Sequence, residues 1–359
     1  MVRQTLRFPG FVDVHVHFRD PGVPSAETTV SGLAAARRGG FAAVVTMPNT
    51  TPPIDTPESV AAHTRRSLGG VALFTSACIT KGRAGKEVAD LAALAAAGAA
   101  FFTDDGAYVA DDHVMEQAMR CSAALGLAIC QHAMDPREQG EGVIRDCALA
   151  RRLGLPVIPV TAETRAIRRD LALCCVTGCR LHIQHISTAE GVALVRDAQA
   201  EGLPVTAEAT PHHLLLSCDE LTADDANFKM APPLGNDIDR AELRRAVKDG
   251  VLMFATDHAP HPAATKSRGF RASANGIVGL ETAIPITYGV MVEEEGMSVN
   301  AWAEAWWRLP RTIMRGLPAD LAETHLSVGD LRAVAPDDFA SLSRNCPYGG
   351  TEWRCWPCE

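Results

Sequence analysis

Histidine and aspartate residues stand at the ends of several short apolar runs in the chain. His15 and His17 alternate with valines in the run FVDVHVHF, and a period of two predicts that both imidazoles point to the same face of a strand. Four further residues follow other apolar runs: Asp105, His132, His185 and Asp257. Imidazole and carboxylate groups are the ligands that zinc and similar ions prefer, and a catalytic site keeps one position open for water.

Four histidines and two carboxylates are more ligands than one zinc ion can use. Two metals that share a bridging carboxylate and a bridging hydroxide would use all six groups. Because the charge of the metals makes hydroxide available at neutral pH, the chemistry expected of such a centre is hydrolysis or its reverse.

Each of these residues also has an ordinary structural interpretation. A single buried histidine is usually a hydrogen-bonded core residue, the DDG sequence at Asp104 and Asp105 is a common turn, and the TDH sequence at Asp257 could cap a helix. We interpret Asp104 as the turn residue and Asp105 as the ligand. His212 and His213 are expected to have structural or supporting roles.

The elements that must hold these residues are short β-rich runs separated largely by helical segments. The helical segments are rich in alanine, leucine and arginine, and several end at glycine, as helices commonly do. The β-runs cover 11–18, 42–46, 71–77, 99–103, 127–131, 181–186, 204–209 and 251–256. Eight such runs predict a (β/α)8 barrel, with an open doubly wound sheet as the alternative. In a barrel the carboxyl ends of all strands meet at one mouth, so the six ligands would become neighbours.

The alternation predicts how the chain is divided. Residues 1–316 are expected to form the barrel, and residues 317–359, where the alternation is lost, an irregular C-terminal extension packed on it. Residues 261–276 are rich in small and basic residues and are predicted to be a loop. Because this loop follows the last β-run, it should face the active site.

Composition excludes several classes of protein. The 359 residues are 47% hydrophobic and carry a net charge of −9, and no lysine or arginine block suggests a nucleic-acid or anionic membrane surface. No apolar run approaches the roughly 20 residues of a membrane helix. The eleven cysteines are thinly spread, several of them in apolar runs, which favours buried reduced thiols. We therefore expect a cytoplasmic protein with a small-molecule partner.

Seven motifs in order extend these arguments: FPGFVDVHVHFRDPG, VVTMPNTTPPID, FTDDG, HIQHISTAEGV, VTAEATPHHLLL, ATDHAPH and NGIVGLETA. Together they resemble the dihydroorotases of the amidohydrolase superfamily, over about residues 8–282. The resemblance implies a metal-bearing (β/α)8 barrel of the amidohydrolase type with little or no accessory β-domain. It also implies the reversible interconversion of N-carbamoyl-L-aspartate and L-dihydroorotate in de novo pyrimidine biosynthesis.

The resemblance assigns roles to single residues. His15, His17 and Asp257 would bind one zinc ion, His132 and His185 the other, and Asp105 would bridge the two. Asp257 would also be the general acid and base. Three residues are expected to bind the carboxylate of the substrate: Arg19, Asn49 and His261. Asn275 and Gly276, at the end of a loop expected to close over the site, are also expected to contact the substrate.

The chain departs from the family's pattern at two positions. Many relatives bridge the metals with a carboxylated lysine, whereas Asp105 stands in this chain. Relatives commonly have Asn or Arg where Ala231 stands, and alanine cannot hydrogen-bond the substrate. Alternative functions are another cyclic amidase, such as a hydantoinase or allantoinase, or a weakly active scaffold subunit for aspartate transcarbamoylase. A homodimer is the expected assembly.

Overall fold

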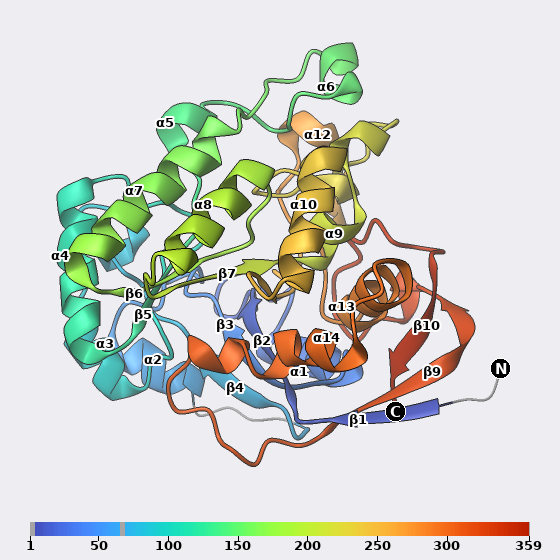
Figure 1. Ribbon diagram of the computed structural model, residues 1–359, viewed down its shortest axis with the longest axis horizontal. Coiled ribbons are helices and arrows are strands. Elements are labelled where there is room, and N and C mark those ends of the chain that lie inside the picture. Colours follow the sequence, from blue (N-terminus) through green and yellow to red (C-terminus); the bar gives the residue numbers. More distant parts are fainter. Residues whose placement is uncertain (1–3, 65–68, 359) are drawn as a thin grey trace.

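The protein is described by a computed structural model that covers residues 4–64 and 69–358. Its centre is a ring of parallel strands, most of them fully buried (Figure 1). The ring strands are β2 (Phe11–Val16), β3 (Phe41–Thr46), β4 (Ala72–Thr75), β5 (Ala128–Gln131), β6 (Arg180–Ile183), β7 (Val205–Ala209) and β8 (Met253–Phe254).

Parallel pairing closes these strands into a barrel. The strands pair in the orders β2-β3-β4 and β5-β6-β7-β8. The expected fourth run, 99–103, joins the two groups, because Phe102 bridges Ala77 on one side and Ile129 on the other. A bridge between Val16 and His258 closes the ring. The expected (β/α)8 barrel is therefore confirmed, and the open sheet is not observed.

Helices surround the barrel, and along the chain most barrel strands are followed by at least one helix (Figure 1). The longer ones are α1 (Thr29–Arg38), α2 (Pro57–Thr64), α3 (Leu91–Ala97), α4 (Asp112–Leu125), α7 (Thr161–Thr177), α8 (Ala189–Ala200), α10 (Asp237–Lys248) and α14 (Val299–Trp307). Short helices lie in the connections: α5 (Pro136–Gln139), α6 (Ala148–Leu153), α9 (Pro211–Leu215), α11 (Ala263–Lys266), α12 (Gly269–Ala272) and α13 (Ala283–Thr287). Within the described ranges, every helix is too short or too polar to cross a membrane.

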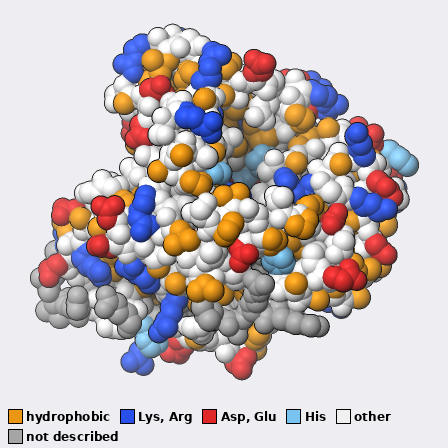
Figure 2. Space-filling model, turned by 180° about the vertical axis from the view of Figure 1, so that it is seen from behind, with side chains coloured by type: hydrophobic (Ala, Val, Ile, Leu, Met, Phe, Trp, Pro, Cys, Tyr) orange, Lys and Arg blue, Asp and Glu red, His pale blue; other side chains and the backbone are white. Residues whose placement is uncertain are grey.

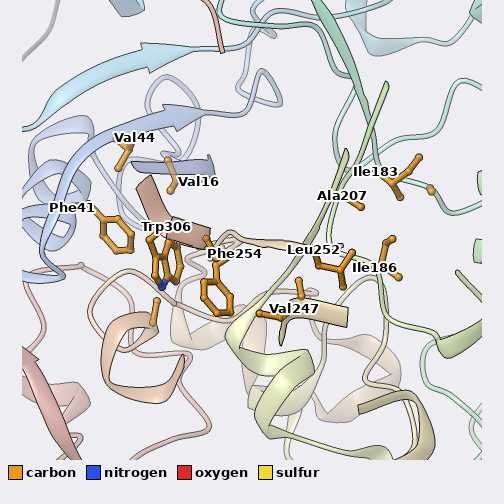
Figure 3. Close-up of a cluster of buried hydrophobic side chains, with 14 of the residues drawn as sticks. Val16, Phe41, Val44, Ile183, Ile186, Ala207, Val247, Leu252, Phe254 and Trp306 are labelled. Atoms are coloured by element: carbon orange, nitrogen blue, oxygen red, sulfur yellow. The ribbon is translucent and has the colours of Figure 1, made fainter. Parts of the chain in front are cut away.

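The core has two layers, as the alternation of side chains along the strands requires. Ala43 and Val45 of β3 belong to a cluster that also contains Ile313 and Met314, whereas Val44 between them packs toward the helices. Figure 3 shows the helix-facing layer, in which Trp306 of α14 stacks on Phe254 with ring centroids 5.0 Å apart. Burial of these large rings fixes α14 against β8, the strand that precedes Asp257.

A small antiparallel sheet joins the two ends of the described chain. It contains β1 (Gln4–Phe8), β9 (Thr324–Ala333) and β10 (Glu352–Pro357), in the order β1-β9-β10. Leu6 pairs with Leu326, and β1 and β10 lie on either side of β9 (Figure 1). Three strands agree with the expectation of little accessory β-structure. The expectation of an irregular extension over 317–359 is wrong, because β9 finds its partner more than 300 residues away in β1.

Candidate metal centre

The ends of the barrel strands bring the predicted ligands together at one mouth. His15 and His17 extend from the end of β2, and Asp257 follows β8, which neighbours β2 in the closed ring. The Oδ1 atom of Asp257 lies 3.0 Å from Nε2 of His17 and 3.4 Å from Nε2 of His15. These three buried side chains form one group able to hold a metal ion.

Asp105 lies between this group and the other two histidines. Its Oδ1 atom is 3.4 Å from His15 Nε2, 3.5 Å from His185 Nε2 and 3.6 Å from His132 Nδ1. Its Oδ2 atom is 3.3 Å from His17 Nε2. One carboxylate therefore faces ligands of both predicted metals, which is the geometry that a bridging group requires.

Two features of the described residues test whether a metal fits this arrangement. The Nε2 atom of His15 and Oδ1 of Asp105 are buried without a hydrogen-bond partner, although burial of an unpaired polar atom is costly. His132 Nδ1 and His185 Nε2 approach to 2.9 Å, so two ring nitrogens converge on the same small volume. Divalent cations at this centre would satisfy these atoms, and the donor set of imidazole and carboxylate suits zinc.

Hydrogen bonds to Glu208 and Asn49 fix the orientation of the His15 and His17 rings. His15 Nδ1 lies 2.5 Å from Oε1 of Glu208, and His17 Nδ1 donates a hydrogen bond of 2.9 Å to Oδ1 of Asn49. Because Nδ1 carries the proton in this arrangement, Nε2 of each ring keeps its lone pair toward the centre. Such partners typically contribute about 10- to 100-fold to metal affinity or activity.

Electrostatics keep the carboxylates of the centre ionised. Burial alone would raise the pKa of Asp257, but His15 and His17 outweigh burial and lower it. Burial also opposes ionisation of Asp105, yet its pKa is lowered well below the usual value by His15 and the other surrounding histidines. Ionised carboxylates are the form that coordinates divalent cations.

The backbone is strained at two of the predicted ligands. His185 has φ 34° and Asp257 has φ 47°, in the left-handed region that residues other than glycine rarely adopt. Such positions cost about 1–3 kcal/mol each and cluster at functional sites. The surrounding barrel holds both residues there, which aims their side chains at the centre.

A cavity of about 190 Å³ opens beside the metal ligands. Arg19, Asn49, Asn275 and Gly276 line it, together with His17, Asp105, His132, His185 and Asp257. Burial lowers the pKa of Arg19 to about 10, so the guanidinium stays cationic at neutral pH. In the space-filling view, histidine side chains lie deep in a hollow on one face of the molecule (Figure 2).

His261 lies behind this lining. Its Nε2 atom donates to the carbonyl oxygen of Asn275 at 2.7 Å, and its ring packs where a side chain on Gly276 would otherwise be. Burial lowers the pKa of His261 to about 3, so the ring is neutral at pH 7. Its expected contact with a substrate carboxylate stays a prediction.

Asp104, His212 and His213, three other histidine and aspartate residues near the centre, have surroundings different from those of the predicted ligands. The carbonyl oxygen of Asp104 accepts from the amide of Ala107 across a turn, and its carboxylate accepts hydrogen bonds from the amides of Ile79 and Thr80 in another segment. His213 bonds Thr210 and the carbonyl oxygen of Pro232. His212 is buried, and its Nε2 atom has no partner among the described residues.

Several residues of the site were not anticipated from the sequence. Glu208 supports His15 and also lies 2.9 Å from His182 Nε2, and Gln139 and Met230 line the cavity. The position of Glu208 inside the apolar run PVTAEA could have indicated a functional role, since a buried carboxylate needs a polar or charged partner. Gln139 and Met230 stand in connections whose sequence carries no such mark.

Comparison with known proteins agrees with this geometry. The family model of dihydro-orotase-like proteins matches residues 5–191. The chain is 42% identical to a dihydroorotase of Geobacillus thermodenitrificans over 362 residues, which cover 97% of this chain and 84% of that protein. It is 41% identical to a dihydroorotase of Thermus aquaticus over 363 residues, covering 97% and 85% of the two chains.

Solved structures share the fold. An L-hydantoinase from Arthrobacter aurescens superposes with a TM-score of 0.83 at 23% identity, over 98% of this chain and 83% of the other. A dihydroorotase from Saccharomyces cerevisiae in complex with 5-fluoroorotic acid gives a TM-score of 0.76 at 18% identity, over 99% and 98%. At these identities the structures establish the barrel fold alone. The family model and the two bacterial relatives go further, and on their evidence this chain belongs to the dihydroorotase family.

Proposed function

We propose that this protein catalyses the reversible interconversion of N-carbamoyl-L-aspartate and L-dihydroorotate in pyrimidine biosynthesis. The observation that carries the proposal is the convergence of six metal-ligand candidates, five of which line a cavity that also contains Arg19 and Asn49. A cationic guanidinium beside a metal centre suits a substrate that has both an amide to cleave and a free carboxylate.

We assign two zinc ions to this centre. His15, His17 and Asp257 would hold one ion, His132 and His185 the other, and Asp105 both. When bound, the metals would polarise the reacting carbonyl and activate a water molecule at neutral pH. The contacts of Asp105 support a bridging role, because Oδ2 lies 3.3 Å from His17 Nε2 and Oδ1 lies within 3.6 Å of His15, His132 and His185.

Asp257 is the proposed acid and base of the reaction. In hydrolysis a C–O bond forms to water and the ring amide C–N bond breaks, so one proton must move from the water to the leaving nitrogen. Asp257 lines the cavity, and its ionised carboxylate can accept that proton and then deliver it. In the biosynthetic direction the same transfers run in reverse.

Arg19 is the proposed anchor of the substrate carboxylate. Its guanidinium lines the cavity while Nε donates to the carbonyl oxygen of Pro260 at 3.3 Å, a contact that leaves the terminal nitrogens available for a carboxylate. Asn49 accepts a bond from His17 through Oδ1, so its amide nitrogen can face the substrate. The two residues would orient the substrate against the ligands.

Location and partners remain predictions from the sequence. We propose a cytoplasmic enzyme that forms a homodimer, and an association with aspartate transcarbamoylase is compatible with the resemblance. Gel filtration with light scattering would measure the assembly.

Metal removal tests the proposed function. We expect the purified protein to hold up to two divalent metals per chain, to lose hydrolysis of dihydroorotate on chelation and to regain it with zinc, because six ligands converge on one site. Elemental analysis beside the activity assay measures both quantities. A fully active protein that never exceeds one metal per chain would exclude the binuclear centre.

Arg19→Lys tests the carboxylate anchor. We expect KM for dihydroorotate to rise about tenfold while metal content stays unchanged, since lysine keeps the charge but loses the two-pronged donor geometry. Arg120→Lys is the matched control, because Arg120 pairs with Glu116 on the surface of α4. Equal KM values in the two variants would contradict the assignment.

A further inference from the structure

The side chain of Asn345 connects the C-terminal extension to the wall of the cavity. Asn345 is only 3% exposed, and both polar atoms of its side chain form hydrogen bonds with the backbone of the barrel loops. Its Nδ2 atom donates to the carbonyl oxygens of Ala259 at 2.9 Å and Gly276 at 3.0 Å, and its Oδ1 atom accepts from the amide of His261 at 3.1 Å.

The three backbone groups that Asn345 holds belong to one unit, which we call the cavity rim: residues 259–261 and 275–276. Ala259, Asn275 and Gly276 line the cavity. The rim is tightly packed, since Gly276 has φ +153° and a side chain there would approach the carbonyl oxygen of Ala259 to 2.6 Å. A displacement of either rim segment would therefore change the shape of the cavity.

The rest of the extension is attached independently of this side chain. Ser343 Oγ donates to the carbonyl oxygen of Ala26 at 2.7 Å, and the amide of Ser341 donates to Glu281 at 3.1 Å. The backbone carbonyl of Asn345 itself accepts from Val278 at 3.1 Å. Because these bonds remain when the side chain is shortened, substitution of Asn345 should alter the rim without detaching the extension.

Lys266 holds the same rim from the other side. Its Nζ atom donates to the carbonyl oxygens of Gly276 at 2.8 Å, Ala274 at 3.0 Å and Lys229 at 3.2 Å. Only the protonated amine has three N–H groups for three acceptors. The carbonyl of Gly276 is thus shared by Asn345 and Lys266, which makes it the point where the two supports meet.

We propose that Asn345 is a positioning residue for substrate binding, which fixes the cavity rim through Ala259, His261 and Gly276. The inference rests on the proposed function, because the rim is expected to contact dihydroorotate. It gives the C-terminal extension a specific role in the affinity for substrate. Of the predicted metal ligands, Asp257 stands two residues before the rim, and the other five come from other segments of the chain.

Kinetics of Asn345→Ala test this role. We expect KM for dihydroorotate to rise about tenfold or more, with kcat within about threefold and zinc content unchanged, since only the cavity wall loses hydrogen bonds. Ser343→Ala is the matched control: it also removes a buried bond of the extension, but one made to Ala26. An unchanged KM, or an equal increase in the control, would overturn the proposal.

A second variant and a second readout keep the test decisive if Asn345→Ala folds poorly. Lys266→Met should also raise KM, and in the double variant the two effects should be less than multiplicative, because both act through Gly276. Hydrogen exchange of the zinc-loaded protein should accelerate over residues 259–278 in Asn345→Ala and not over 11–18. Unchanged exchange at the rim would overturn the proposal whatever the substrate. Failure of the wild type to act on dihydroorotate would instead count against the proposed function.

Discussion

Asp257→Asn is expected to lower kcat by about 10²- to 10⁴-fold, the range typical of losing general acid and base catalysis. The amide cannot carry the proton from the attacking water to the leaving nitrogen, although its oxygen still offers a ligand atom. Binding of substrate should suffer less, because Arg19 and Asn49 are untouched. Steady-state kinetics at saturating zinc, in both directions of the reaction, measure this effect.

Metal content must be measured in the same preparation, since Asp257 is also a predicted ligand. Asp249→Asn provides a control, because Asp249 is an exposed carboxylate at the C-terminal end of α10 that pairs with Arg196. Near-normal kcat in a fully metallated Asp257→Asn protein would show that another group transfers the proton. His261 would then be the first residue to test.

Asp105→Ala is expected to weaken both metals and to abolish nearly all activity. Its two oxygens lie 3.3–3.6 Å from ring nitrogens of all four histidines, so its removal takes away a contact of both proposed metal sites. The loss should exceed the roughly 10- to 100-fold that follows removal of a supporting partner. Zinc titration of the apo-protein, followed by activity, measures both effects.

The same centre predicts that bicarbonate has no influence on reconstitution. A lysine bridge must first be carboxylated, whereas an aspartate is ready as synthesised. Lys81, which stands ahead of the 99–103 run, is exposed and pairs with Glu87, and among the described residues no lysine lines the cavity. Lys81→Ala is therefore the control and should keep full activity. Reconstitution that requires bicarbonate would mean that the bridging group is misassigned.

The barrel was predictable because its signals are local. Each β-run is short and apolar and most are followed by a helical segment, and this alternation alone indicates parallel strands. The order of the ring then follows from the order of the chain. The fourth run is the partial exception, since it forms only bridges through Phe102.

The small sheet could not be predicted by such reasoning. The residues of β1 are mostly exposed and its partner β9 lies more than 300 residues away, so neither strand shows a strong pattern of its own. These strands are stabilised mainly by their pairing with each other, and a single sequence does not reveal which distant segments pair. The rim contacts of Asn345 escaped prediction for the same reason.

The candidate ligands were predictable from residue type and position, because strand ends of a parallel barrel share one mouth. Their supports were harder to predict. Asn49 was expected to contact substrate and is found bonded to His17, and Glu208 was not considered. A hydrogen bond across the barrel depends on side-chain geometry that periodicity does not contain.

Turnover of several cyclic amides by one zinc-loaded preparation tests the central claim most directly. Hydantoinases share the fold and the family's general chemistry, so dihydroorotate, hydantoin and allantoin should be compared at equal concentration with metal content measured. The proposed role of Arg19 and Asn49 in binding the substrate carboxylate predicts that dihydroorotate is hydrolysed far faster than the other two, which lack that carboxylate. Faster hydrolysis of hydantoin or allantoin, or no hydrolysis of dihydroorotate by protein that holds two metals, would contradict it.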